Sequence, residues 1–187
     1  MQISIKTNFP DVQRRIDSLR KEIAEQATPR AVNRTLDQAR TRMSRAIRAE
    51  FNIKASQVNA LLRVNRASYR AGVYRITGSL ESPTKRGRAL NVIHFEARKS
   101  AHGVTVKILR KGPRKEIKGA FIGNGGRTVF KRVGKARLPI QAVQTIDVQQ
   151  MFNAKRVKEL VMRMIEEKFP EIFEREARFY TEKFNRS

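Results

Sequence analysis

The sequence contains no cysteine and no tryptophan, and it has few acidic residues and only two histidines. Without cysteine, disulfides, thiolate zinc sites and cysteine nucleophiles are excluded, and the composition fits a reducing compartment. No apolar run approaches the ~18 residues of a membrane-spanning helix. Residues 1–6 lack the charged region and the apolar stretch of a signal peptide. The sequence therefore predicts neither membrane insertion nor export.

Basic residues outnumber acidic ones by 41 to 17 among the 187 residues, so the formal net charge at pH 7 is +24. Residues 30–115 carry 21 basic and 4 acidic side chains, and residues 116–156 carry 8 and 2. A hydrophobic content of 40% with ten phenylalanines predicts a folded chain rather than a disordered basic tail. Because folding does not require such a charge excess, we expect a polyanionic partner; a merely solvated basic surface is the alternative.

Apolar residues recur at helical spacing near both ends of the chain and alternate as in strands between them. Pro29 and Pro170 are expected to end or divide helices, because proline lacks the amide hydrogen of an interior helical bond. The predicted helices span residues 10–27, 29–51, 54–62, 148–168 and 170–184, and the predicted strands span residues 2–6, 73–76, 91–95, 104–108, 119–122, 128–133 and 138–143.

This pattern predicts an α+β fold, with N-terminal helices and long C-terminal helices packed on a small, mainly antiparallel β-sheet with basic loops. The pair Asn124-Gly125 is typical of a tight hairpin turn, and its segment lacks the helix and the Lys-Ser/Thr ending of a P-loop. We expect a single domain over residues 1–187. It would comprise an N-terminal strand and helices (1–62), a β-rich basic region (63–146) and C-terminal helices (147–187).

Candidate binding residues follow from where the basic side chains gather. The helix predicted over residues 29–51 has an arginine face that core burial does not explain, because unpaired arginine is almost never buried. The basic loops 82–88 and 110–115 contain glycine and proline, and we expect weak order in them before a partner binds. The predicted DNA- or partner-binding set is Arg40, Arg42, Arg45 and Arg48 on the helix, and Lys85, Arg86, Arg88, Arg110, Lys111, Arg114 and Lys115 on the loops.

Enzyme chemistry is difficult to build from this sequence. His94 and His102 lie in a predicted strand and a predicted loop, without the spacing of a metal pair. The few carboxylates of the basic middle match no nuclease pattern, and arginines are available to pair with each of them. We therefore expect no catalytic residue, no metal and no cofactor; DNA cleavage that needs a divalent cation would instead indicate a basic nuclease. These carboxylates are Asp37, Glu50, Glu81, Glu96 and Glu116.

Two blocks of the sequence carry a family resemblance. Residues 31–34 read Ala-Val-Asn-Arg, and Ala39 follows in an alternating Arg/Ala helix. Later, Gly-Ala-Phe-Ile at 119–122 precedes Phe-Lys-Arg-Val-Gly-Lys-Ala-Arg-Leu-Pro-Ile at 130–140. With these blocks the chain resembles the phage minor tail protein Z family, the tail completion proteins of lambda-like phages. Members often have a tryptophan in the strand before Arg132, where this chain has Thr128-Val129-Phe130.

The resemblance implies a non-enzymatic virion protein at the head-proximal end of a long tail. Such a protein is added late in assembly, in the host cytoplasm, and completes the tail so that it joins the head and the genome end is placed for ejection. The family motif adds Arg132, Lys135 and Arg137 to the predicted binding set, with local pinning of a turn as the alternative. Phe121, Val133 and Pro139 are expected to be core or edge-strand residues; Pro139 suits an edge strand because it cannot donate a ladder hydrogen bond.

The expected partners are the tail terminator and tail tube proteins, the head–tail connector proteins, and the genomic DNA end or the tape-measure protein. The family implies a homo-hexameric ring in the virion, whereas repulsion between strongly basic copies predicts a monomer when free. Contacts with phosphates would need no sequence readout. The alternative function is a stand-alone, sequence-nonspecific nucleic-acid-binding protein, although the predicted strands lack the exposed aromatic platforms of single-strand binders.

Overall fold

The computed structural model describes residues 2–5, 10–69, 77–83 and 89–186. It confirms the predicted α+β class, because long helices accompany three antiparallel sheets of three strands each. The chain divides into two compact units. Unit 1 comprises Met1–Met43, Leu62–Pro83 and Lys155–Ser187, and unit 2 comprises Ser44–Leu61 and Thr84–Ala154.

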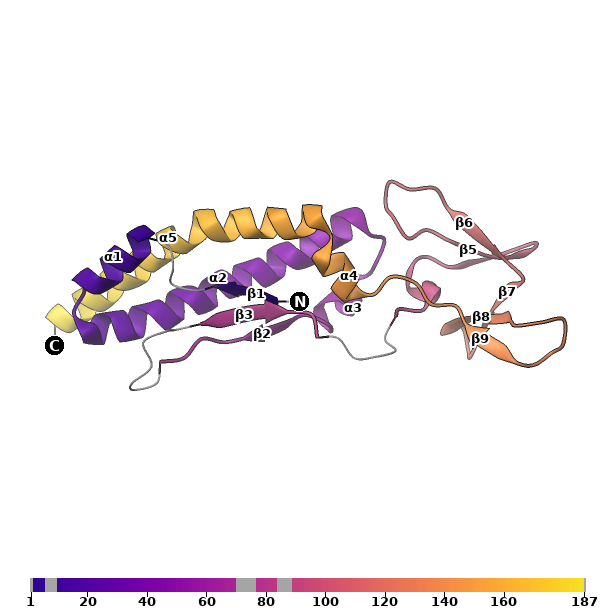
Figure 1. Ribbon diagram of the computed structural model, residues 1–187, viewed down its shortest axis with the longest axis horizontal. Helices are drawn as coiled ribbons and strands as arrows, with labels where there is room; N and C mark the ends of the chain where they lie inside the picture. Colours follow the sequence, from indigo (N-terminus) through magenta and orange to yellow (C-terminus); the bar gives the residue numbers. More distant parts are fainter. Residues whose placement is uncertain (1, 6–9, 70–76, 84–88, 187) are drawn as a thin grey trace. The chain divides into compact units, whose positions relative to one another are not determined.

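Unit 1 is built from helices and one small sheet (Figure 1). Its elements are β1 (Gln2–Ile5), α1 (Pro10–Ser18), most of α2 (Lys21–Glu50), β2 (Arg63–Asn65), β3 (Gly78–Glu81) and α5 (Lys155–Asn185). Strand β3 pairs with both β1 and β2, and Ile3 lies opposite Leu80 with both side chains buried. The sheet packs closely on α2, because a Cβ atom added at Gly78 would lie only 2.6 Å from Leu36.

Helix α5 runs alongside α2 in unit 1 (Figure 1). Both helices bury apolar side chains spaced three or four residues apart, which is the pattern of a helix with one face in a core. The helical spacing of apolar residues that the sequence shows near both ends of the chain is therefore confirmed in the central parts of α2 and α5. The buried side chains are Val32, Leu36, Ala39 and Met43 on α2 and Val157, Val161, Ile165, Phe169, Phe173 and Ala177 on α5.

The two prolines that were expected to divide helices lie inside continuous helices, so both predicted divisions are wrong. Helix α2 passes through Pro29 and helix α5 passes through Pro170. Residues on both sides of each proline are buried, and this tertiary packing offsets the lost backbone bond. The first break falls instead after Ser18, whose hydroxyl donates to the Arg15 carbonyl. In the described part of the chain, no helix is both long and apolar enough to cross a bilayer.

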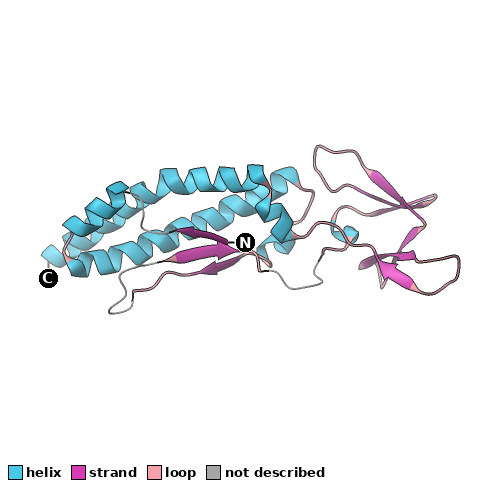
Figure 2. Cartoon of the chain, viewed as in Figure 1, coloured by secondary structure: helices cyan, strands magenta, loops and turns pink. Residues whose placement is uncertain are grey.

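Unit 2 consists mainly of short strands and loops (Figure 2). Its elements are α3 (Ala55–Asn59), the 3-10 helix η1 (Val92–His94), β4 (Arg98–Ser100), β5 (Gly103–Val106), β6 (Lys115–Lys118), β7 (Ala120–Gly123), β8 (Thr128–Arg132), β9 (Ile140–Ala142) and α4 (Val148–Asn153). The strands form two sheets, in the orders β4-β5-β6 and β7-β8-β9. A small core of Val92, Val104, Val106, Ala120 and Val129 joins them.

Local turn chemistry predicted one part of unit 2 well. The hairpin of β7 and β8 is confirmed, with Phe121 opposite Phe130 and with Asn124 and Gly125 at positive φ. Strand β9 lies at the sheet edge, as predicted. The strand predicted over residues 91–95 is wrong, because the Asn91 side chain accepts a hydrogen bond from the Ile93 amide and starts η1. The strand predicted over 73–76 lies outside the described residues.

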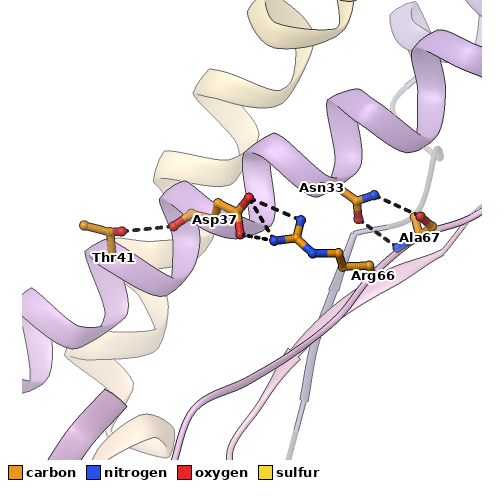
Figure 3. Close-up of polar contacts among 5 residues, drawn as sticks. All are labelled: Asn33, Asp37, Thr41, Arg66 and Ala67. Atoms are coloured by element: carbon orange, nitrogen blue, oxygen red, sulfur yellow. Dashed lines mark hydrogen bonds and ion pairs between the residues drawn. The ribbon is translucent and has the colours of Figure 1, made fainter. Parts of the chain in front are cut away.

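Polar contacts attach the segment after β2 to helix α2 (Figure 3). The Asn33 amide donates to the Ala67 carbonyl at 2.9 Å and accepts from the Ala67 amide at 2.8 Å. One turn further along α2, Asp37 pairs with Arg66 at 3.0 Å, and Thr41 donates to the Asp37 carbonyl. Asn33 belongs to the first block of the family resemblance, and its contact shows a structural role for that block.

Candidate nucleic-acid interface

Unit 2 is where positive charge gathers without compensation. It contains 19 basic and 4 acidic residues, whereas unit 1 contains 22 and 13. Among the described residues, one ion pair lies within unit 2, between Arg114 and Glu96 at 2.9 Å. The basic side chains of unit 2 thus outnumber the carboxylates that are available to neutralise them.

Two arginines at the start of the predicted basic face have a partner inside unit 1. Glu176 of α5 is only 3% exposed, and both Arg34 and Arg30 of α2 form ion pairs with its carboxylate. Arg30 also donates to the Tyr180 hydroxyl at 2.7 Å, and this hydrogen bond is the main cause that raises the pKa of Arg30. These two arginines therefore join α2 to α5. Sequence reasoning missed the pairing because the carboxylate lies far along the chain.

The four helix arginines of the predicted binding set do not share one face. Arg40 and Arg42 differ by about 200° around a helix that turns by about 100° per residue. Arg42 lines a groove in unit 1 with residues of α5, whereas Arg45 and Arg48 belong to unit 2. Arg45 is exposed and Arg48 is half-buried near the end of α2. The predicted single arginine face is wrong, because Arg40 and Arg42 lie on nearly opposite sides of the helix.

The basic loop 110–115 is held by hydrogen bonds at both ends. The Arg110 amide donates to the Glu50 carbonyl at 3.0 Å, and its Nε donates to the Arg48 carbonyl, so Arg110 caps the end of α2. Arg114 donates to the backbone carbonyl of Glu96 at 2.7 Å as well as to its carboxylate. Lys111 is exposed, and Lys115 is the first residue of β6 rather than a loop residue. Lys85, Arg86 and Arg88 lie outside the described residues.

Residues 131–140 comprise the last two residues of β8, the loop 133–139 and the first residue of β9, and we call this segment the basic arm. Every side chain of the arm is exposed, including those of Arg132, Lys135 and Arg137. Arg132 lies over the Phe121 ring, 5.4 Å from its centroid, which is a cation–π contact. Val133 is 65% exposed, so its predicted core position is wrong. The reason is that β8 ends at Arg132, so Val133 lies in the loop beyond the sheet core, where its amide donates to the Pro139 carbonyl.

A cleft in unit 2 contains basic residues that sequence reasoning missed. Arg48 and Arg110 of the predicted set line it together with Lys54, Arg127 and His94. Burial and the charge of Lys54 lower the pKa of His94. No spacing signal connects these residues, because they come from segments up to 79 positions apart. Among the described residues, no three His, Asp or Glu side chains are placed so that they could hold a metal ion.

A family model described as prophage minor tail protein Z (GPZ) matches residues 11–184 of the chain. The match extends over both units and includes the Asn33 block and the basic arm. No curated protein and no solved structure matches the chain.

Proposed function

The chain belongs to the prophage minor tail protein Z family, and from this premise we propose that it completes the head-proximal end of a phage tail and directs unit 2 towards DNA. As a member of this family it is a structural tail protein of the virion and contacts other tail components. The family role is structural, which favours a protein without catalysis. We retain one tail-completion domain over residues 1–187 as part of this proposal.

The uncompensated charge of unit 2 is the observation that carries the DNA-facing part of the proposal. With 19 basic and 4 acidic residues, unit 2 would repel itself unless a polyanion were near. Duplex DNA carries about one negative charge per 1.7 Å and releases condensed counterions when lysine and arginine bind its phosphates. Such binding ignores base sequence, which suits a protein that meets whichever sequence lies at the end of the tail.

The basic arm supports a second contact, with a neighbouring protein. Val133 and Leu138 are 65% and 67% exposed, and an apolar side chain gains by leaving water but gains nothing from a phosphate. The tail terminator, tail tube and connector proteins are the candidate neighbours. In a homo-hexameric ring each copy would also repel the next through its net charge, so we propose a monomer in solution that assembles on its partners.

Quantitative mass spectrometry of purified particles, with tails separated from heads, tests this proposal. We expect about six copies per tail, since ring symmetry at a tail end requires a fixed copy number. Antibody-gold labelling of a tagged chain should mark the head-proximal end. Absence from particles, with the protein found on cellular nucleic acid instead, would favour the stand-alone nucleic-acid-binding protein. Magnesium-dependent cleavage of DNA by the purified chain would favour the nuclease.

A further inference from the structure

The cleft of unit 2 is formed by segments that are distant in sequence. Arg48 comes from the end of α2, Lys54 directly precedes α3, and Arg110 comes from the basic loop. His94 ends η1, and Arg127 lies in the turn between β7 and β8. The cleft has a volume of about 820 Å³, which is within the range of small-molecule sites in proteins. It can therefore admit a group as large as a nucleotide.

The charge of the cleft is strongly unbalanced. Four cationic side chains line it, and the carboxylate among its lining residues belongs to Glu96. That carboxylate is already bound by Arg114, so it leaves the four cations largely uncompensated. The lowered pKa of His94, caused by burial and by Lys54, indicates that the cleft resists a further positive charge. An anion in the cleft would relieve this repulsion.

Arg110 and Arg48 each have a feature that favours binding of an anion in the cleft. Arg110 is oriented by its hydrogen bonds to the end of α2, so little side-chain freedom would be lost when it binds a ligand. Arg48 has a buried Nε atom with no hydrogen-bond acceptor among the described residues. A buried donor without an acceptor is destabilising, so the Arg48 side chain gains little from its present position within the protein. Arg48 also lines the cleft, where an oxyanion would accept hydrogen bonds from the guanidinium N–H groups that face it.

We propose that this cleft binds a phosphate group, supplied in the virion by DNA. Cationic groups on separate segments suit a tetrahedral anion, which accepts hydrogen bonds from several directions, better than a planar carboxylate. The inference deepens the proposed function and rests on it only for the source of the phosphate. An internal phosphodiester and a terminal phosphate present the same chemistry to the cleft. An acidic protein segment is the competing ligand.

The two histidines make phosphate binding observable on the full-length chain. His94 lines the cleft, whereas His102 is exposed outside its lining. We expect inorganic phosphate to shift the imidazole NMR signals of His94 at fixed pH and ionic strength and to leave those of His102 in place. An equal shift at both histidines, or none at His94, would overturn the proposal. A shift with poly-glutamate but not with phosphate would assign the cleft to an acidic protein partner and would also overturn it.

A matched pair of double variants tests whether the cleft itself is responsible. Lys54→Gln/Arg127→Gln removes two cleft charges at exposed positions, and Lys54 makes no side-chain cap bond to α3. Arg178→Gln/Arg186→Gln removes two exposed charges of unit 1. We expect the cleft variant to weaken phosphate binding about tenfold or more, as for lost charge-assisted hydrogen bonds, and the control to bind normally. Lys54→Arg, which keeps the charge, should bind nearly as well as the parent chain.

Equal weakening in both double variants would show a general charge effect and would overturn the site. Dispersed His94 and His102 signals in each variant report that unit 2 remains folded. Short duplexes with and without a 5′-phosphate then identify the source: equal affinity indicates the phosphodiester, and tighter binding of the phosphorylated duplex indicates the terminus. Each of these results supports phosphate binding in the cleft. The particle analysis is separate, so phosphate binding by a protein absent from tails would refute the proposed function alone.

Discussion

The two units use their charged residues in opposite ways. Among the described residues, unit 1 holds at least eight ion pairs and unit 2 holds one. In the part of the chain that the structure describes, the one buried charged side chain is Glu176 of unit 1, which joins two helices. Unit 2 spreads its cations over an end of α2, a capped loop, a cleft and an arm. The comparison teaches that the described ion pairs join segments mainly in unit 1, whereas few of the cations of unit 2 have a carboxylate partner, as the proposed contact with a polyanion requires.

Both units use an asparagine side chain to hold together segments that are distant in sequence. Asn33 of unit 1 exchanges two hydrogen bonds with the backbone of Ala67. Asn91 of unit 2 does the same with Val129, at 3.0 and 2.9 Å, and also accepts from the Ile93 amide. In each case a side-chain amide bonds both backbone groups of one residue that is distant in sequence, so that a helix or turn is held against that residue's segment.

Truncation of the unit 1 core should have the largest effect and tests whether the units are separate. Phe173→Ala removes a fully buried ring and should destabilise unit 1 by about 3–5 kcal/mol. All three tyrosines lie in unit 1, so tyrosine fluorescence during urea unfolding reports on that unit. Phe179→Ala, at a 54% exposed ring, is the control and should cost much less. Amide exchange at Val104 and Val129 should stay unchanged; equal loss of protection there would break the comparison.

Substitution of Asn91 or Asn33 should have the next largest effect on stability, and each substitution should destabilise only the unit that contains it. Asn91→Ala should cost about 1–3 kcal/mol in unit 2, because it leaves the partly buried amide groups of Val129 and Ile93 without their acceptor. Asn33→Ala should cost somewhat less in unit 1, since two bonds are lost rather than three. Hydrogen exchange resolved by residue measures both. Substitution by Asp keeps the acceptor oxygen and removes the N–H donor, so these variants should have stabilities between those of the parent chain and the Ala variants. A loss of stability in the other unit would contradict the assignment of each asparagine to a single unit.

Neutralisation of Glu176 tests whether charge stabilises unit 1. Glu176→Gln keeps the shape of the side chain but removes the partner of Arg34, and should cost roughly 1–2 kcal/mol in unit 1. Glu174→Gln is the matched control, because Glu174 pairs with Arg15 at an exposed position, and its effect should stay within about 0.5 kcal/mol. Urea unfolding followed by tyrosine fluorescence compares them. Similar costs for both variants would mean that burial of the pair is unimportant.

Acidification should have the smallest effect, and it should act on unit 2. The pKa of His94 is lowered below its ordinary value of 6.5 by burial and by Lys54, with Arg48, Arg110 and Glu96 also lining its cleft. The unfolded chain therefore takes up the proton first, so unit 2 loses stability as pH falls below about 6.5 and through the folded pKa. Thermal unfolding followed by NMR at several pH values should show this loss. His94→Gln should remove this pH-dependent loss of stability, and His102→Gln should not. If His102→Gln removed it and His94→Gln did not, the burial of His94 would not be its cause.

Local features of the fold could be predicted, and features that depend on packing could not. Asn124 and Gly125 specify the β7–β8 hairpin by their own backbone preferences, so its prediction was correct. Pro29 and Pro170 gave misleading local signals, because buried neighbours on both sides keep those helices continuous. The strand predicted at 91–95 failed for a similar reason: Asn91 bonds to β8, a segment that no local pattern connects to it.

The candidate site follows the same division. The net charge, the excess of basic residues over 30–156 and the two blocks of family resemblance can all be read from the linear sequence. They already indicated a tail protein with an anionic partner. Which cations remain uncompensated depends on neighbours in space. Glu176 binds Arg30 and Arg34, whereas Lys54 and Arg127 line a cleft whose described carboxylate, that of Glu96, is already paired with Arg114. Electrostatic attraction acts over a few ångströms rather than along the sequence, and so tertiary structure alone separated the structural charges from those available to a phosphate.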